Sequence, residues 1–288
     1  MSDMQGKVVL ITGATNGIGR AAALALARRG ATVAVAGRSQ QRLDDTLAML
    51  RAESGVEAVS GLLADLSTQA GVRQLADAFR EQHDRLDILL NNAGANFRER
   101  ADTADGLERT FAVNHIAYYL LTRLLLDLLQ ASAPARIVNV SSEAHRQQRT
   151  FDFDNLDGRK RWGMFGFGAY SQSKLANVLF TRELARRLEG SGITVNSMHP
   201  GVVNTGLFQN VGGIGGLVLG ALAPVFMKTP EQGADTLIWL ATAGEMEGRS
   251  GGYYDRRRLR EPSAAAQDDD AARRLWALSA ELCGLCAG

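Results

Sequence analysis

Short apolar segments alternate with longer segments of helical periodicity along most of the chain. Several of the short segments, such as Val-Val-Leu-Ile, are apolar at every position, which is typical of parallel strands covered on both faces. This pattern predicts strands at residues 8–12, 32–36, 58–63, 88–91, 136–140, 194–199 and 252–254. Apolar positions three and four apart predict helices at residues 18–29, 41–51, 69–82, 107–130, 170–189, 230–243 and 268–283.

The alternation of strands and helices predicts a single doubly wound α/β domain over residues 1–288, with a mostly parallel sheet of about seven strands and helices on both faces. Two segments, 143–169 and 206–228, break the alternation, and long irregular segments in a compact domain are commonly functional loops. Each follows a strand whose carboxyl end should face the ligand in this architecture. We therefore expect both segments to border a substrate.

Composition excludes several classes of protein. With 45% apolar and 22% charged residues the chain is ordinary for a globular protein, and its net charge of +1 gives no reason to expect nucleic acid or an anionic membrane as partner. Residues 1–7 show no basic leader, and the weakly polar stretch 211–227 contains glycines and a proline, so neither a signal peptide nor a transmembrane segment is predicted. The only cysteines, Cys283 and Cys286, favour a reducing cytoplasm.

A glycine-rich turn, Thr12-Gly-Ala-Thr-Asn-Gly-Ile-Gly19, follows the first predicted strand and opens the first helix. Glycines at 13, 17 and 19 would let a pyrophosphate approach the backbone amides, and the positive end of the helix would attract it. A turn without a ligand is the alternative, but the strand before it and the helix after it favour a dinucleotide site.

Tyr170 and Lys174 lie four residues apart and would share one face of a helix. Hydride transfer to a carbonyl leaves an alkoxide that needs a proton, and a free phenol, with a pKa of about 10, transfers protons poorly at neutral pH. A nearby ammonium group would lower that pKa. Taken alone, such a pair is usually a surface tyrosine and a solvated lysine, so its neighbours decide its meaning.

Several motifs, in a fixed order along essentially the whole chain, resemble the short-chain dehydrogenase/reductase family. They are the Gly-x3-Gly-x-Gly turn, Asp65-Leu66, Asn91-Asn-Ala-Gly94, Ser141-Ser142, Tyr170-x3-Lys174 and His199-Pro-Gly201 with Thr205. The resemblance implies a Rossmann-type fold and a nicotinamide-dependent oxidoreductase acting on CH–OH or C=O carbons, assembled as a homodimer or homotetramer. It assigns the dinucleotide-binding part to about residues 1–140.

The resemblance also implies site residues. Tyr170 would be the acid/base, Lys174 would lower its pKa, and Ser142 would polarise the carbonyl, with Ser141 as the alternative. Asn114 would hold a water chain that links the lysine to solvent. The implied cofactor-binding residues are Gly13, Thr15, Asn16, Gly17, Ile18, Gly19, Arg38, Asp65, Leu66, Asn92, Ala93, Gly94, Tyr170, Lys174, Pro200, Gly201, Val203 and Thr205.

The end of the second predicted strand indicates the cofactor. NAD-specific proteins of this fold usually place an acidic residue there, which would repel a 2′-phosphate, but here Gly37 is followed by Arg38. A guanidinium pairs well with that phosphate. Because Asn16 rather than a basic residue precedes the middle glycine, we expect NADP(H) to be preferred and NAD(H) to bind less well.

Ser142 and Tyr170 are 28 residues apart, more than is common in the family. With Gly252-Tyr-Tyr254 near the C-terminus, this insertion resembles the retinol dehydrogenase-like branch, which implies a small lipophilic aldehyde, ketone or alcohol as substrate and carbonyl reductase activity. Candidates to line a cleft, with core packing as the alternative, are Phe151, Phe153, Trp162, Met164, Phe165, Phe167, Leu207, Phe208, Leu217, Val218, Leu219 and Leu222. Glycines 212, 213, 215 and 216 would let the second segment hinge.

Other signals are weaker. The four histidines lack ligand spacing, so no metal site is predicted, and His145 is expected either to line the pocket or to be a solvated loop residue. Cys283-x-x-Cys286 lacks the βαβ unit of a redox motif. The main rival function is a dinucleotide-binding redox sensor without turnover, since a fold does not decide a function. The complete Tyr, Lys, Ser and Asn set favours the enzyme, and a nucleotide-sugar epimerase fits the glycine spacing poorly.

Overall fold

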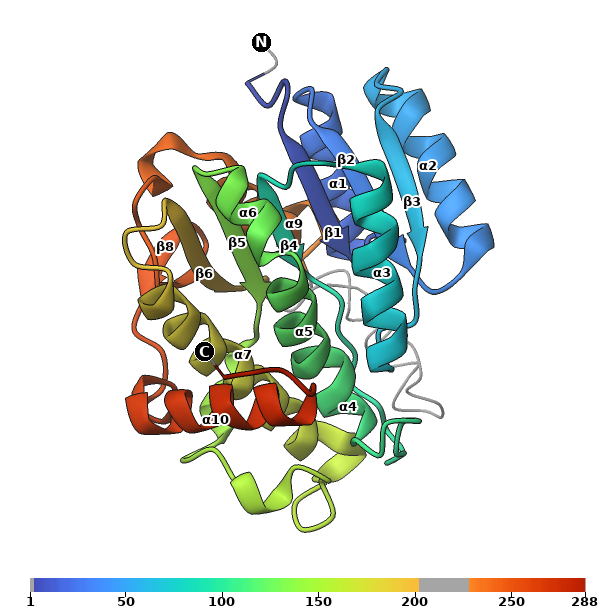
Figure 1. The fold of residues 1–288 in the computed structure, drawn as a ribbon. Helices are drawn as coiled ribbons and strands as arrows, with labels where there is room; N and C mark the ends of the chain where they lie inside the picture. The colour runs from blue at the N-terminus through green and yellow to red at the C-terminus, as the bar shows by residue number, and fades with distance from the viewer. Residues whose placement is uncertain (1–2, 202–227, 288) are drawn as a thin grey trace.

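The computed structural model describes residues 3–201 and 228–287 (Figure 1). Within these ranges one sheet of eight strands has the order β3-β2-β1-β4-β5-β6-β7-β8. Strands β1 to β7 pair in parallel, and β8 pairs antiparallel with β7. The strands are β1 Val8–Thr12, β2 Thr32–Gly37, β3 Val59–Leu63, β4 Ile88–Asn91, β5 Ala135–Val140, β6 Ile193–His199, β7 Tyr253–Asp255 and β8 Arg258–Arg260. The predicted doubly wound sheet is confirmed.

Strand β8 is the element that the hydrophobic pattern misses. Its three residues are all exposed and two of them are arginines, so it has no apolar signal. The strand forms because Arg256 and Arg257 adopt left-handed backbone angles, with φ of 50° and 58°, and reverse the chain into a hairpin. The expected strand count of about seven is therefore one too low.

Helices cover both faces of the sheet, as predicted (Figure 1). One face carries α1 (Gly17–Arg28), α2 (Gln40–Ser54) and α9 (Pro230–Thr242). The other carries α3 (Gln69–Gln82), α5 (Ala117–Leu124), α6 (Leu126–Ala131) and α7 (Phe167–Arg187), with α10 (Asp269–Leu282) packed on α7. Within the described ranges, no helix combines the length and the apolar character needed to cross a membrane.

The helix predicted at residues 107–130 is interrupted in the structure. A short α4 (Arg109–Phe111) leads into a π-helical turn (Ala112–Ile116) before α5, and α6 follows after Leu125. The π turn contains Asn114, whose side-chain amide bonds both the N–H and the C=O of Ala95 at 2.9 Å. Such turns are frequent at functional sites, and apolar periodicity does not reveal them.

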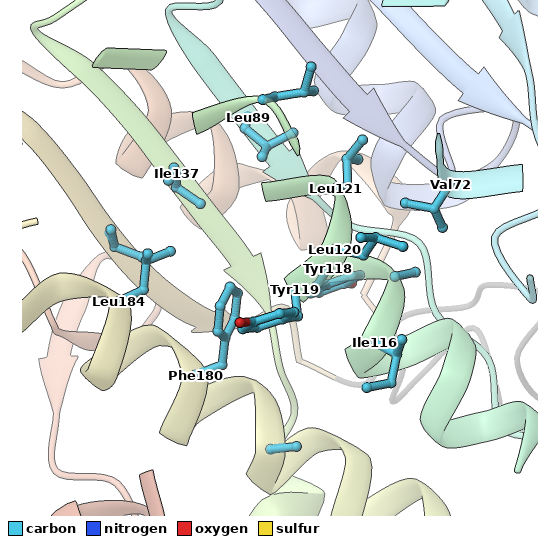
Figure 2. Close-up of a cluster of buried hydrophobic side chains, with 14 of the residues drawn as sticks. Val72, Leu89, Ile116, Tyr118, Tyr119, Leu120, Leu121, Ile137, Phe180 and Leu184 are labelled. Carbon is cyan, nitrogen blue, oxygen red and sulfur yellow. The ribbon is translucent and has the colours of Figure 1, made fainter. Parts of the chain in front are cut away.

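The core on the α5 and α7 side of the sheet gathers side chains from β4, β5, α3, α5 and α7 (Figure 2). Helix α10 extends this core outward. Its Trp276 is 3% exposed, stacks on Phe180 at 6.1 Å between ring centroids and meets the Tyr119 ring edge-on at 5.0 Å. The Arg187 guanidinium lies 4.4 Å from the Trp276 ring. Helix α10 therefore holds the outer side of α7, the helix that carries Tyr170 and Lys174.

Replacing Trp276 by alanine should lower the free energy of unfolding by about 3–5 kcal/mol, as for other buried aromatic side chains. Trp239 of α9 is the matched control, because it is only half-buried and packs edge-on against Tyr254. Trp239→Ala should cost clearly less. Urea denaturation of both variants measures the difference, and equal losses would mean that α10 contributes little to the core.

Candidate active site

The glycine turn packs directly against the segment that follows β4. A Cβ on Gly13, whose φ is +66°, would lie 2.7 Å from the Cα of Ala93. A Cβ on Gly19 would lie 2.5 Å from Nδ2 of Asn92 and 2.6 Å from the carbonyl oxygen of Gly13. Both positions therefore exclude any larger residue, and the turn closes tightly over the carboxyl ends of β1 and β4.

Thr12 and Asn92 fasten these two strand ends together. The Thr12 hydroxyl oxygen accepts hydrogen bonds from the N–H groups of Asn92 and Ala93, at 3.0 and 3.1 Å. In return, the Asn92 amide donates to the carbonyl oxygens of Thr12 and Gly13, at 2.9 and 3.2 Å. These four hydrogen bonds fix the position of the glycine turn relative to the end of β4.

The N-terminus of α1 has no capping side chain. Asn16 occupies the cap position in an extended conformation, with φ of −158°, and its side chain makes no capping hydrogen bond. The first turn, which includes Gly17 and Ile18, contains no acidic residue. Helix N–H groups without a side-chain acceptor, at the positive end of the helix dipole, favour a bound anion such as a phosphate.

At Gly37, the last residue of β2, the neighbouring side chains leave no space for an acidic side chain. A Cβ on Gly37 would lie 2.5 Å from Cγ2 of Thr15, so the space beside this glycine is filled by the threonine methyl group. The following Arg38 is exposed, and no ion pair found among the described residues involves it. An anionic group bound at the first turn of α1 would therefore meet a guanidinium and no carboxylate at this position.

Asp65 and Leu66 follow β3 at the same edge of the sheet. The Asp65 carboxylate is exposed and accepts a hydrogen bond from the backbone N–H of Ser67 at 2.9 Å, which closes a local turn. Leu66 is half-buried against the core. The Ala64 N–H donates to the Gly37 carbonyl at 2.9 Å, so this turn lies next to the end of β2.

Tyr170 and Lys174 lie one turn apart near the start of α7. Lys174 is 3% exposed, and its Nζ donates to the carbonyl oxygen of Val140 at 3.0 Å and lies 5.7 Å from the centre of the Tyr170 ring. Burial lowers the pKa of Lys174 to about 7. Burial also raises the pKa of Tyr170, while a hydrogen bond with the Ser142 side chain lowers it. Burial therefore favours the neutral forms of both the Tyr170 phenol and the Lys174 amine in the unliganded site.

The structure distinguishes the two candidate serines. Ser141 is 1% exposed and its hydroxyl donates to the backbone carbonyl of Lys174 at 2.7 Å, so this side chain serves to hold α7. Ser142 is half-buried, and its hydroxyl is the one that interacts with Tyr170. Its Oγ also accepts a hydrogen bond from the Ala144 N–H at 3.2 Å. The geometry therefore favours Ser142 over Ser141.

Asn114 and Gly94 border the buried ammonium group. A Cβ on Gly94 would lie 3.1 Å from Nζ of Lys174 and 3.3 Å from Oδ1 of Asn114. The Asn114 amide donates to the Ser173 hydroxyl at 2.9 Å, and that hydroxyl donates to the carbonyl oxygen of Tyr170 at 2.7 Å. An ammonium group has three donors, and among the described residues only Val140 accepts from Lys174. The remaining donors suit a ribose hydroxyl or water.

The segment after β6 is described only in part. Lys228 donates to the carbonyl oxygen of Pro200 at 3.1 Å, and Gly201 has a left-handed φ of +89°. Val203 and Thr205 lie outside the described residues. So do glycines 212, 213, 215 and 216 and the cleft candidates Leu207, Phe208, Leu217, Val218, Leu219 and Leu222.

The aromatic residues of the first irregular segment divide into two groups. Phe151 is 6% exposed and belongs to the core, and Phe153 packs against it at 4.7 Å between ring centroids. For these two residues core packing, the alternative to a cleft, is the correct interpretation. Met164, Phe165 and Phe167 are exposed, and the Phe167 ring centroid lies 6.1 Å from that of Tyr170. Trp162 is half-buried and donates to the carbonyl oxygen of Arg98 at 3.1 Å.

Three polar residues close to the site are missing from the predicted set or were interpreted wrongly. Thr12 and Ser173 hold the two halves of the site, and although they lie inside the glycine turn and the Tyr170-x3-Lys174 motif, no role is predicted for either of them. A polar residue inside an otherwise buried strand or helix is the signal that could have identified them. His145 is completely buried, so its expected alternative as a solvated loop residue is wrong.

Comparison with known proteins agrees with this geometry. The sequence model of a family described as short chain dehydrogenase matches residues 7–152 and 158–213. Retinol dehydrogenase 13 of Homo sapiens is 44% identical over 284 residues, covering 97% of this chain and 85% of its own length. A solved structure from Mycobacterium Paratuberculosis has a TM-score of 0.79 at 32% identity, covering 99% of this chain and 96% of that chain. The Pseudomonas aeruginosa RhlG/NADP active-site complex has a TM-score of 0.72 at 28% identity, covering 92% and 98%.

The low pKa of Lys174 should make the stability of the unliganded protein depend on pH. The group has a pKa of about 7 in the folded protein and an ordinary value of 10.5 in the unfolded chain, so between these values the unfolded chain binds the extra proton. The free energy of unfolding should therefore rise from pH 7 toward pH 9, by at most about 1.4 kcal/mol per pH unit from this group, and fall as the pH returns to 7.

Urea titrations of the parent and Lys174→Met at about pH 7, 8 and 9 measure this contribution. The variant should lose most of the rise because its side chain does not titrate. Lys160→Met, at an exposed position, controls for the loss of a lysine. The same pH slope in the parent and in Lys174→Met would show that the buried amine keeps its proton.

Proposed function

The chain belongs to the short-chain dehydrogenase family and is retinol dehydrogenase-like, and on that premise we propose that it is an NADP(H)-dependent oxidoreductase. Its substrate in this proposal is a lipophilic aldehyde or ketone that it interconverts with the corresponding alcohol. The observation that carries the proposal is the grouping of three side chains at the carboxyl edge of a parallel sheet: Tyr170 interacts with the Ser142 hydroxyl, and the buried Lys174 Nζ lies 5.7 Å from the centre of the Tyr170 ring.

A bound nicotinamide supplies or accepts the hydride. Ser142 donates its hydroxyl proton in a hydrogen bond to the substrate oxygen, while its Oγ accepts from the Ala144 N–H. Tyr170 donates a proton to the alkoxide in reduction and accepts it back in oxidation. Lys174 takes up a proton and stabilises the resulting phenolate, and Asn114 holds the water chain that returns this proton from solvent.

Reduction should suit this site near neutral pH. Burial keeps the Tyr170 phenol protonated, and a pKa of about 7 lets Lys174 gain a proton there as the phenolate forms. The proton can thus pass without leaving an isolated charge in a buried site, which would cost far more than a paired one. A sensor without turnover would bury the same amine with no such benefit, so we favour the enzyme over that alternative.

The residues of the glycine turn fit a dinucleotide, since Gly13 and Gly19 let the turn pack closely against the end of β4, and the N-terminus of α1 has neither a capping nor an acidic side chain. In our assignment the pyrophosphate lies at the N-terminus of α1, the adenine at Asp65 and Leu66, and Asn92, Ala93 and Gly94 follow the cofactor toward the active site. Pro200, Gly201, Val203 and Thr205 would lie along the nicotinamide. The related RhlG complex contains NADP, which supports a nicotinamide dinucleotide here.

A lipophilic substrate is supported by two observations. The exposed Phe167 places an apolar ring next to Tyr170, and a relative sharing 44% identity is a retinol dehydrogenase. Turnover of NADPH with a panel of aldehydes and ketones of graded size identifies the substrate class.

We also propose a reducing compartment such as the cytoplasm, because Cys283 and Cys286 are both free. For the oligomeric state we propose a homodimer or homotetramer, which light scattering would test.

Tyr170→Phe should abolish most of the turnover because it removes only the hydroxyl that transfers the proton. We expect kcat to fall by at least about 10²–10⁴-fold, the usual contribution of general acid–base catalysis. Binding of NADPH, followed by its fluorescence, should change little. Turnover of the Phe variant at the parent rate would refute the proposed chemistry.

Arg38→Ala tests the cofactor preference. Loss of a charge-assisted pair with the 2′-phosphate costs about 1.5–3 kcal/mol, so NADPH should bind about ten- to a hundred-fold more weakly while NADH is almost unaffected. Arg28→Ala is the matched control, since Arg28 lies at the opposite end of α1 and pairs with Glu53. Parent protein that binds NADH as tightly as NADPH, or equal losses of both in Arg38→Ala, would rule out Arg38 as the selector.

A further inference from the structure

A network of hydrogen-bonded polar groups surrounds the turn that follows Ser142. This turn is a 3-10 helix at Glu143–Gln147, and within it the side chain of His145 is completely buried. The imidazole ring packs edge-on against Tyr253 of β7, at 4.9 Å between ring centroids. The proposed mechanism gives this histidine no role, although it lies three residues from the proposed catalytic serine.

Two hydrogen bonds determine the protonation state of His145. The backbone N–H of Ser263 donates to Nε2 at 3.1 Å, so Nε2 must be without a proton. The other ring nitrogen, Nδ1, lies 2.7 Å from the carbonyl oxygen of Ser142, which can only accept. The Nδ1 atom must therefore bear the proton, and His145 is the neutral Nδ1–H tautomer.

These bonds constrain the backbone on which the Ser142 hydroxyl depends. The Ser142 carbonyl accepts from both the N–H of His145, at 3.1 Å, and its Nδ1–H, so both lone pairs are used. With the Ser142 Oγ accepting from Ala144, the turn also restricts the directions in which the hydroxyl proton can point. A movement of about 1 Å at such a group is enough to cost two orders of magnitude in rate.

His199, at the end of β6, binds the backbone of Glu143, the residue that follows Ser142. Its Nδ1 accepts from the backbone N–H of Glu143 at 3.3 Å. The Glu143 carboxylate accepts from the Tyr253 hydroxyl at 2.9 Å and from Nε of Arg146 at 2.8 Å. His199 at the end of β6 and Tyr253 at the start of β7 therefore hold the backbone and the side chain of Glu143 in this turn.

We propose that His145, as the neutral Nδ1–H tautomer, is the positioning residue for Ser142: it binds the Ser142 carbonyl, aims the hydroxyl at the substrate oxygen, and ties this turn to the chain at Ser263. The proposal rests on the catalytic role assigned above to Ser142.

Protonation of His145 would break this arrangement, because a proton on Nε2 would face the N–H of Ser263. Burial lowers the pKa of His145, and Arg146 lowers it further, while the bond to the Ser142 carbonyl and the Glu143 carboxylate raise it. Tyr253 faces the ring from β7. His199, whose own pKa burial lowers, faces Glu143, Asp255 and Lys228. Because its pKa is lowered, His145 stays neutral at pH 7. The hydrogen bond from Ser263 is lost only when the pH falls through the pKa of His145.

Two amide substitutions separate the two bonds of His145. His145→Asn places an amide nitrogen near the position of Nδ1 and keeps the donor for Ser142, whereas His145→Gln reaches the position of Nε2 and keeps only the acceptor for Ser263. We expect His145→Gln to lower kcat at least about tenfold with KM little changed. His145→Asn should keep kcat within about threefold of the parent, even though both variants melt at lower temperature.

Steady-state kinetics with NADPH and the carbonyl compound of the panel that is reduced fastest provide this comparison, with melting temperatures recorded in parallel. A purely structural role would lower kcat of both variants together, in step with their melting temperatures. Equal losses in the Asn and Gln variants, or a parent-like kcat in His145→Gln, would overturn the positioning role.

Nitrogen NMR of the imidazole ring tests the tautomer without any turnover. In the parent protein near pH 7 we expect a protonated Nδ1 and an unprotonated Nε2 for His145, and the reverse would overturn the proposal.

A double variant tests whether His145 acts through Ser142. When His145→Gln is added to Ser142→Ala, kcat should fall no further, since both substitutions act through one hydroxyl. A parent-like kcat for Ser142→Ala alone would refute the proposed function and the positioning role together, whereas the wrong tautomer beside an inactive Ser142→Ala would refute the positioning role alone.

Discussion

Two reciprocal hydrogen bonds fasten helix α7 to the carboxyl end of β5. The Lys174 ammonium donates to the Val140 carbonyl at 3.0 Å, and the Ser141 hydroxyl donates to the Lys174 carbonyl at 2.7 Å. Through them the helix is held where Tyr170 meets Ser142 and where the amine is buried without a carboxylate partner among the described residues. Everything proposed about proton transfer depends on this contact, because it sets the position of Tyr170 relative to Ser142 and the desolvation that shifts the pKa values of Tyr170 and Lys174.

A buried amine is costly, and the surrounding core supports it by holding α7 from both sides. Toward the sheet, a chain of buried amides and hydroxyls joins the strands to the helix: Asn91 donates to Asn139 at 2.9 Å and Asn139 to Thr181 at 3.0 Å. On the outer side, Trp276 of α10 packs on Phe180. Polar groups satisfied inside the core specify one arrangement of helix and sheet, whereas apolar contacts alone would tolerate small shifts.

The glycine turn and the catalytic turn depend on the same kind of support. The Asn92 amide binds the carbonyl oxygens of Thr12 and Gly13 in the glycine turn, and the Thr12 hydroxyl binds the N–H groups that follow β4. His145 binds the carbonyl oxygen of Ser142. In each case a polar side chain satisfies carbonyl or N–H groups that regular secondary structure leaves unpaired. The residues that would touch cofactor and substrate thus lie on loops whose geometry also depends on partners distant in the sequence: Asn92 lies 80 residues from Thr12, and Ser263, which binds His145, lies 118 residues from it.

The sequence by itself determined the doubly wound sheet, the order of its elements and the choice of most residues of the proposed site. Apolar periodicity is a local property, and motifs such as Tyr170-x3-Lys174 keep their geometry because the residues share one helix turn. Only the tertiary structure decided the rest. It selected Ser142 over Ser141, buried His145 in a defined tautomer, assigned Phe151 to the core, introduced the π turn at Asn114 and added β8. Each of these features depends on partners from other strands and helices, or on backbone angles that no apolar pattern encodes. Because hydrogen-bonding groups find their partners only when the strands and helices pack, a single sequence does not reveal which groups will pair.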